Sequence, residues 1–212
     1  MGNRIKIKVC GIRLLSNRLS LEQLPVDYLG FIFYRRSKRY VGDLPEEGLF
    51  DSKKKKVAVF VDESIETISE ITNRYNILFV QLHGNEDPLT CNKLRNSGLT
   101  VIKAFNLHEK FDFDNLKNYE DMTDFFLFDT KSELPGGSGE KFNWQILEKY
   151  SGKIPFFLSG GIGPADVPII KKVNHTRLFG VDVNSGFECQ PGIKNIDKLK
   201  NFLTELYELP CK

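Results

Sequence analysis

Eight short apolar runs recur along the chain, and they constrain its fold more than any other feature. Each run is about four to six residues long, and several are continuously apolar rather than alternating with polar residues. Continuous runs of this length are typical of strands buried on both faces, as in parallel sheets. The eight runs are Ile5–Val9, Tyr28–Phe33, Val57–Val61, Ile77–Leu82, Thr100–Ala104, Phe125–Phe128, Pro155–Leu158 and Leu178–Val181.

Segments compatible with helices lie between most of these runs. Ile65, Ile68 and Ile71 fall on one helical face, and Ser64 precedes them as a candidate cap. Asp87 is followed by a proline, which favours the first turn of another helix. The intervals after the first two runs are irregular, so we expect short or distorted helices there. Three further helices are predicted at Phe142–Tyr150, Pro164–Val173 and Ile196–Leu206.

The alternation of eight strands with helices leaves two architectures for an α/β chain. One is an open doubly wound sheet, and the other is a closed (β/α)8 TIM barrel. The strand count favours the barrel, and 212 residues lie close to the lower bound of roughly 200 residues for that fold. We therefore predict a single (β/α)8 barrel domain over residues 1–212, with some helices short or irregular.

Composition bears on the class of partner. Thirty Lys and Arg oppose 28 Asp and Glu, so the net charge of +2 gives no reason to expect nucleic acid. No apolar run reaches the ~18 residues of a spanning helix, and the first ten residues hold no signal-peptide core, so we expect no membrane. The four cysteines and three histidines lack metal-site spacing. We expect no metal, and free thiols in a cytoplasmic protein.

A glycine-rich segment after the seventh run predicts a phosphate site. Ser159, Gly160 and Gly161 precede a helix that we expect to begin at Pro164. Glycine lets backbone N–H groups approach an anion, and barrels of this type often bind phosphate after strands seven and eight. The alternative is a tight turn that merely uses glycine. The segment matches neither a dinucleotide fingerprint nor a P-loop, which disfavours NAD and ATP.

Other candidate groups follow the ends of several runs. Cys10 is either a buried packing thiol or a base whose pKa is lowered by positive potential. Asp129 is a helix cap, an ion-pair partner or a proton donor. Arg39 belongs to a cationic segment that is mostly solvated surface, although one guanidinium fork would suit a carboxylate. For His83, a structural role and a catalytic role are equally compatible with the sequence.

These strand-end segments together resemble a known family. In order along the chain they read KVCGIR (8–13), GFIFY (30–34), SKRYV (37–41), VQLHG (80–84), DTK (129–131), GGSG (136–139), LSGGIGP (158–164) and GVDVNSGFE (180–188). Each block alone is weak, but the ordered set from residue 8 to about residue 203 resembles the phosphoribosylanthranilate isomerases. Two positions depart from the family pattern, because Arg35 stands where a proline is usual and Arg13 where a threonine is usual.

The resemblance implies an aldose–ketose isomerase of tryptophan biosynthesis that uses neither metal nor cofactor. Its reaction is the Amadori rearrangement of N-(5'-phosphoribosyl)anthranilate, a phosphorylated small molecule, in a cytoplasmic monomer or homodimer. Cys10 is implied to be the general base, Asp129 the general acid, and Arg39 the group that binds the anthranilate carboxylate. The glycine-rich segment 136–139 is expected to act as a lid. The residues implied to hold the phosphate are Gly160, Gly161, Asp182, Asn184 and Ser185.

Two other functions remain open at this stage. One is a different phosphosugar barrel, such as an indole-glycerol-phosphate synthase, but that chemistry usually relies on a lysine where this chain has Cys10. The other is a barrel that binds a phosphorylated ligand without catalysis. The presence of Cys10, Asp129 and Arg39 argues against it.

Overall fold

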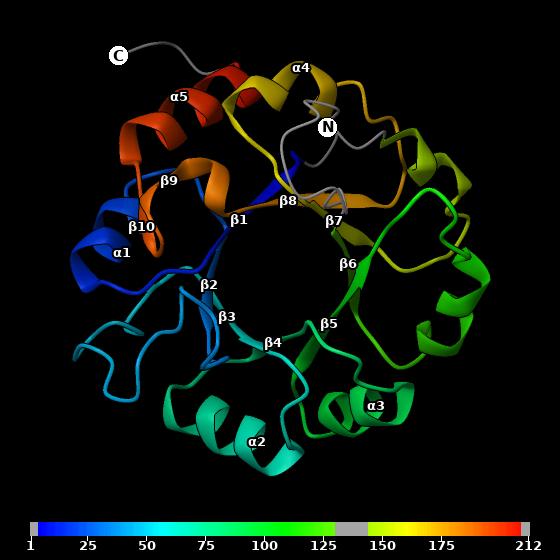
Figure 1. The fold of residues 1–212 in the computed structure, drawn as a ribbon, viewed down its shortest axis with the longest axis horizontal. Coiled ribbons are helices and arrows are strands. Elements are labelled where there is room, and N and C mark those ends of the chain that lie inside the picture. The colour runs from blue at the N-terminus through cyan, green and yellow to red at the C-terminus, as the bar shows by residue number, and fades with distance from the viewer. Residues whose placement is uncertain (1–3, 130–143, 209–212) are drawn as a thin grey trace.

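Eight parallel strands close into a barrel that is surrounded by helices (Figure 1). The computed structural model describes residues 4–129 and 144–208. Each strand pairs with the next in parallel, and β1 pairs with β8 to complete the ring. The closed barrel confirms the (β/α)8 prediction over the open sheet. The strands are β1 Lys6–Cys10, β2 Tyr28–Ile32, β3 Lys55–Phe60, β4 Phe79–Leu82, β5 Thr100–Asn106, β6 Phe125–Asp129, β7 Phe156–Ser159 and β8 Leu178–Val183.

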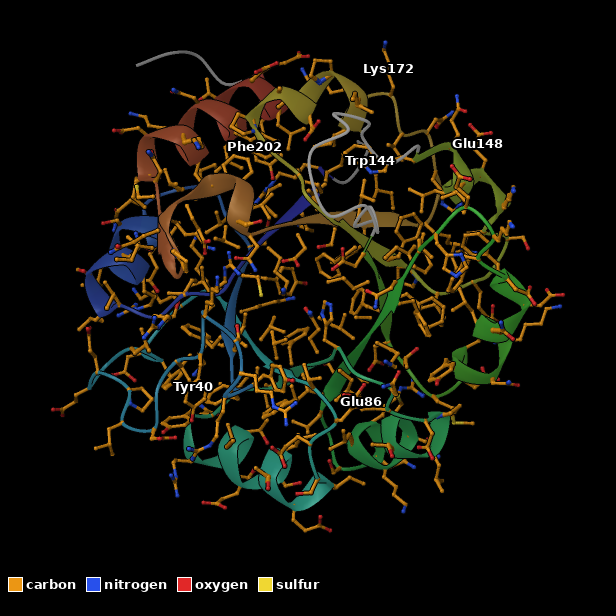
Figure 2. All side chains as sticks on the ribbon, viewed as in Figure 1. Tyr40, Glu86, Trp144, Glu148, Lys172 and Phe202 are labelled. Atoms are coloured by element: carbon orange, nitrogen blue, oxygen red, sulfur yellow. The ribbon has the colours of Figure 1, made fainter. Side chains whose placement is uncertain are left out.

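Each strand contributes to two apolar layers, because successive side chains point to opposite faces. Val57, Ile102 and Leu127 belong to the cluster that fills the barrel lumen. Val9 and Phe31 belong to the larger cluster between strands and helices. Figure 2 shows side chains filling both spaces. This double burial is the physical reason why the sequence runs are continuously apolar.

Aromatic side chains close the N-terminal end of the lumen. Tyr28 meets Phe157 and Phe79 edge to face, with ring centroids 5.4 and 5.5 Å apart. Phe125 and Phe179 complete the group, at a centroid distance of 4.7 Å from each other. These rings come from the first or second residues of their strands. The lower lumen is therefore a packed core, and polar side chains are left to the opposite end.

The outer shell contains five α-helices and four 3-10 helices within the described residues. The predicted cap at Ser64 is confirmed, because Ser64 Oγ accepts from Thr67 N at 3.1 Å. The helix predicted to start at Asp87 is present as well, and Asp87 Oδ1 caps it by accepting from Thr90 N at 2.7 Å. The α-helices are α1 Leu15–Glu22, α2 Ile65–Arg74, α3 Pro88–Asn96, α4 Val167–Ile170 and α5 Ile196–Tyr207. The 3-10 helices are η1 Phe113–Tyr119, η2 Trp144–Lys149, η3 Pro164–Asp166 and η4 Ser185–Phe187. None of these helices is long and apolar enough to cross a membrane, as far as the described residues go.

The helices after β5, β6 and β7 are short or of the 3-10 type, whereas the sequence predicted short or distorted helices after the first two strands. The helix predicted over Pro164–Val173 is divided into η3 and the four-residue α4. Pro164 and Pro168 each lack a backbone N–H, which limits regular helical hydrogen bonding in this segment. Within the helix predicted at Phe142–Tyr150, the described part is the 3-10 helix η2. The sequence did not predict η1, or the hairpin of β9 Glu188–Gln190 and β10 Ile193–Lys194.

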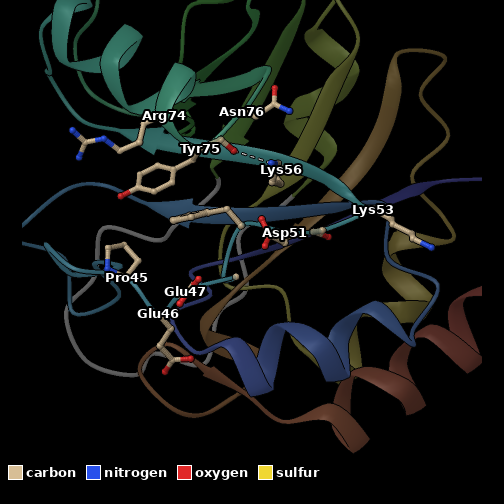
Figure 3. Close-up of a pocket in the computed structure, with 12 residues that line it drawn as sticks. Pro45, Glu46, Glu47, Asp51, Lys53, Lys56, Arg74, Tyr75 and Asn76 are labelled. Atoms are coloured by element: carbon tan, nitrogen blue, oxygen red, sulfur yellow. Dashed lines mark hydrogen bonds between the residues drawn. The ribbon is translucent and has the colours of Figure 1, made fainter.

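The connection from β2 to β3 contains no helix, and a cavity of about 690 Å³ lies beside it (Figure 3). The cavity is bordered by residues 45–53, the start of β3 and the C-terminal end of α2. Its lining carries both acidic side chains, such as Glu46 and Asp51, and basic ones, such as Lys53 and Arg74. Lys56 Nζ donates to the carbonyl of Tyr75 at 2.8 Å. This cavity belongs to the outer layer and is separate from the C-terminal ends of the strands.

Candidate active site

Cys10 and Asp129 are the last residues of β1 and β6, at the C-terminal end of the barrel. Cys10 is 3% exposed and packs in the lumen cluster. Gly30 lies beside it on β2, where a Cβ atom would come within 2.8 Å of the Cys10 sulfur. Glycine at this position therefore makes room for the thiol. Asp129 lies two residues beyond the lumen residue Leu127, so it shares the same face of β6.

His83 and Gln81 lie next to Asp129. His83 Nε2 is 3.5 Å from Asp129 Oδ2, and His83 Nδ1 is 2.7 Å from Gln81 Nε2. Asp129 Oδ1 is buried and has no hydrogen-bond partner among the described residues. One oxygen of the carboxyl thus faces an imidazole, while the other remains able to bond a ligand. The structure gives His83 a contact with the candidate acid, which the sequence left undecided.

A buried ion pair lies in the lumen near Cys10. Lys8 Nζ is 2.8 Å from Asp182 Oδ1, and Ser159 Oγ donates to Asp182 Oδ2 at 3.3 Å. The side chains of Lys8 and Asp182 are 0% and 5% exposed. The family resemblance implied that Asp182 helps to hold the phosphate, and the structure bonds its carboxylate to Lys8. Lys8 itself was missed, although a lysine that alternates with Ile7 and Val9 just before a strand end is a detectable signal.

Burial raises the pKa of the Cys10 thiol, because the thiolate loses its hydration inside the lumen. The ammonium groups of Lys8 and Lys194 oppose this effect, and the Asp182 carboxylate adds to it. The net direction is upward, whereas the catalytic alternative for Cys10 called for a lowered pKa. Positive charge is present around the thiol as expected, but desolvation outweighs it.

Arg39 is held at the barrel mouth by Glu188. Arg39 Nε and Nη2 donate to the two oxygens of Glu188 at 2.8 and 2.6 Å. Lys194 Nζ donates to Glu188 Oε1 at 2.7 Å and to Asn184 Oδ1 at 2.7 Å. Burial of Glu188 raises its pKa, but the hydrogen bonds from Arg39, Lys194 and the Gly192 amide outweigh burial and lower it to about 2. Glu188 and Lys194 were not predicted, because they lie on the unpredicted hairpin.

The loops after β7 and β8 adjoin each other. Gly160 and Gly161 adopt left-handed backbone conformations, with φ of 101° and 65°. A Cβ atom at Gly161 would meet no atom within 4 Å, so this backbone borders open space. At Gly186, in the other loop, a Cβ atom would collide with the carbonyl oxygen of Ile162. The predicted phosphate residues Asn184 and Ser185 immediately precede this contact.

Two predictions remain, which concern the lid and a metal ion. The proposed lid at 136–139 lies outside the described residues. In the described ranges 4–129 and 144–208, no group of three His, Cys, Asp or Glu side chains is arranged to hold a metal ion.

Comparison with known proteins identifies the family. A model of the family described as N-(5'-phosphoribosyl)anthranilate (PRA) isomerase matches residues 7–205. The chain belongs to the N-(5'-phosphoribosyl)anthranilate isomerase family. Within this family, a relative from Parabacteroides distasonis is 47% identical over 204 residues, covering 94% of this chain and 92% of that protein.

Solved structures of PRA isomerases share the fold. One is a complex with reduced 1-(o-carboxyphenylamino)-1-deoxyribulose 5-phosphate, with a TM-score of 0.80 and 31% identity, covering 97% of this chain and all of that chain. Another describes monomers generated from the dimeric enzyme of Thermotoga maritima, with a TM-score of 0.80 and 30% identity, covering the same shares. The resemblance inferred from the sequence blocks is thus confirmed, and so is the assignment to an isomerase.

Proposed function

We propose that this member of the PRA isomerase family converts N-(5'-phosphoribosyl)anthranilate to 1-(2-carboxyphenylamino)-1-deoxyribulose 5-phosphate, a step of tryptophan biosynthesis. One observation carries the assignment of roles: Cys10 and Asp129 end two different strands and face the same lumen mouth. A thiol and a carboxyl at one mouth provide a base and an acid for a proton shift within one bound sugar.

In the first step, Asp129 donates a proton to the ring oxygen of the furanose. The bond between that oxygen and the carbon bearing nitrogen breaks, and the nitrogen lone pair forms a cationic C=N bond. Asp129 Oδ1 suits this role because it is buried without a hydrogen-bond partner among the described residues. His83, at 3.5 Å from Oδ2, faces the carboxylate that the step leaves behind.

In the second step, the Cys10 thiolate removes the proton from the adjacent sugar carbon. The electrons of that C–H bond form a C=C bond and neutralise the nitrogen, giving an enolamine. The enolamine then tautomerises, so that the hydroxyl proton is lost, the carbon beside nitrogen gains a proton, and a ketone results. The positive nitrogen acidifies the C–H group, and the base and acid need only be held at the correct positions.

Substrate binding is proposed for both ends of the molecule. Glu188 occupies the Nε edge of the Arg39 guanidinium, and the opposite edge is proposed to bind the anthranilate carboxylate. Gly160, Gly161 and Ser185 are proposed to bind the phosphate from the loops after β7 and β8. Asn184 bridges the two regions through its bond to Lys194.

We further propose that residues 1–212 form one domain, working in the cytoplasm as a monomer or homodimer on a phosphorylated small molecule. The free thiols of Cys10, Cys91 and Cys189 support a reducing compartment. Support for the two oligomeric states comes from the Thermotoga maritima relative, whose dimeric enzyme has been converted to monomers.

The test is a fluorescence assay of N-(5'-phosphoribosyl)anthranilate consumption by the purified protein and by two variants. Cys10→Ala and Asp129→Ala should each lower kcat by about 10²–10⁴-fold, because each removes one partner of the proton transfer. Circular dichroism should show an intact fold in both. Turnover near the wild-type rate in either variant would remove that residue from its role, and no turnover by the wild type would refute the activity.

A further inference from the structure

Lys194 is a buried cation that the steps above do not use. Its side chain is 0% exposed, and its ammonium bonds Glu188 Oε1 and Asn184 Oδ1 at 2.7 Å each. Its backbone is fixed as well, because Lys194 N donates to Asn17 Oδ1 at 2.8 Å and Asn17 Nδ2 donates to the Lys194 carbonyl at 2.9 Å. Burying an ammonium is costly, and a buried ion pair is weak evidence for a stabilising role. A functional explanation for its position is therefore needed.

The Lys194 ammonium is connected through Asn184 to the residue that directly follows the candidate base. Asn184 Oδ1, which it bonds, lies against Gly11, where a Cβ atom would approach that oxygen to 2.9 Å. Gly11 directly follows Cys10, and its φ of 81° together with the lack of a side chain permits this close packing. Lys194 and Cys10 interact electrostatically, in the direction that favours the thiolate. The lysine is thus held by two hydrogen bonds in a fixed position relative to the Gly11 backbone.

Charged groups from several elements act on Cys10. The ammonium groups of Lys8 on β1 and Lys194 on β10 favour the thiolate, and the Arg39 guanidinium after β2 interacts with it as well. The Asp182 carboxylate on β8 opposes them, and the Asp129 carboxyl on β6 faces the same mouth. In a site shielded from water the cations reduce the cost of burying the thiolate.

We propose that Lys194 is a positioning residue for Cys10: its buried ammonium, fixed by Glu188 and Asn184, supplies part of the positive potential that stabilises the thiolate. Lys8 has the larger favourable effect on the thiolate, but it is paired with the Asp182 carboxylate, which opposes that effect. Lys194 and Arg39 share a single carboxylate, Glu188, so these three groups together carry one net positive charge. This inference rests on the proposed function, in which Cys10 is the base.

The experiment titrates Cys10 directly. The ultraviolet absorbance of the thiolate is followed against pH in the full chain, and the same titration in the Cys10→Ser background is subtracted. Lys194→Met should raise the apparent pKa of Cys10 by roughly one unit, which lowers the thiolate fraction about tenfold at neutral pH. The double variant Lys194→Met/Glu188→Gln restores the charge balance, so its Cys10 pKa should return toward the wild-type value.

The double variant separates electrostatics from packing. A purely structural role for Lys194 predicts that the double variant is at least as perturbed as the single one. Lys103→Met is the matched control, because Lys103 is equally buried and paired with Glu86 at 3.1 Å but lies in the layer beside α3, near Cys91. It should leave the Cys10 titration unchanged.

Three results would overturn the proposal: no shift in Lys194→Met, no recovery in the double variant, or an equal shift in Lys103→Met. Should Lys194→Met fail to fold, Lys194→Gln keeps a hydrogen-bonding side chain and is titrated in its place. Because the titration requires no turnover, its outcome is independent of the activity assay. Failure of the proposed function would appear as lack of turnover by the wild type, whatever the titration shows for the pKa of Cys10.

Discussion

At the scale of single residues, the candidate site depends on side chains that are already bonded to the protein. Glu188 fixes the Arg39 guanidinium along one edge, which orients the other edge before any substrate arrives. Gly30 leaves space for the Cys10 sulfur, and Asp129 keeps one oxygen without a partner among the described residues. Such preorganisation reduces the entropy lost when the substrate is aligned.

Replacing Arg39 tests the carboxylate site. Arg39→Ala should raise KM for N-(5'-phosphoribosyl)anthranilate by roughly 10- to 100-fold, since a charge-assisted hydrogen bond is worth about 1.5–3 kcal/mol. The decrease in kcat should be smaller than the rise in KM, because Arg39 interacts with the Cys10 thiolate but donates no hydrogen bond to the reacting bonds in the proposed mechanism. Arg35→Ala is the control, since Arg35 is 75% exposed and pairs with Asp43. An unchanged KM in Arg39→Ala would exclude Arg39 from the site.

At the scale of elements, the hairpin of β9 and β10 brings Glu188 and Lys194 to the mouth of the barrel. Its two strands are short and antiparallel, and they follow β8 after the 3-10 helix η4. The Gly192 amide in its turn donates to Glu188 Oε1 at 3.0 Å. The hairpin therefore connects the phosphate loop after β8 with the Arg39 loop after β2.

The lowered pKa of Glu188 predicts a pH-dependent contribution to stability. The carboxylate has a pKa of about 2 in the folded state against an ordinary value of 4.5, so its stabilising effect is complete above about pH 4.5 and is lost as the pH falls toward 2. Glu188→Gln should lower the free energy of unfolding by on the order of 3 kcal/mol at pH 7 and by clearly less at pH 3. Urea titrations of variant and wild type at both pH values measure this difference. Equal differences at the two pH values would contradict it.

At the scale of the whole molecule, the closed barrel places its packed apolar core and its candidate site at opposite ends of the lumen. The N-terminal half of the lumen is filled by aromatic rings, and the C-terminal half carries the charged groups. Parallel strands bring all their C-terminal ends to one face, so residues distant in sequence meet there. Lys8 and Asp182, for example, are separated by 174 positions along the chain.

Removing a ring from the lumen base should destabilise the barrel. Phe157 is 0% exposed and contacts Tyr28, Phe125 and Phe179. Phe157→Ala should cost about 3–5 kcal/mol in the free energy of unfolding, because it leaves a cavity in a packed core. Leu78→Ala should cost less than about 0.5 kcal/mol, because Leu78 is 61% exposed. Denaturant unfolding of both variants measures the contrast, and similar losses would contradict the packed-base interpretation.

The sequence by itself determined the strand order, the barrel and most of the candidate site. Strand periodicity and helix caps are local signals, so the eight strands, the cap at Ser64 and the helix start at Asp87 could be predicted from nearby residues. Cys10 and Asp129 were found because both directly end an apolar run. The family resemblance supplied their roles, which remain predictions until the variants are assayed.

Only the tertiary structure decided the electrostatics of the site. The partner of Asp182 is Lys8 rather than a ligand group, and the pKa of Cys10 is raised rather than lowered. Both outcomes depend on burial and on charges brought from distant strands, which no local pattern records. The hairpin that carries Glu188 and Lys194 was likewise missed, because strands of three and two residues are too short to show periodicity. Local chemistry fixed which groups are present, whereas desolvation and long-range pairing fixed what each group does.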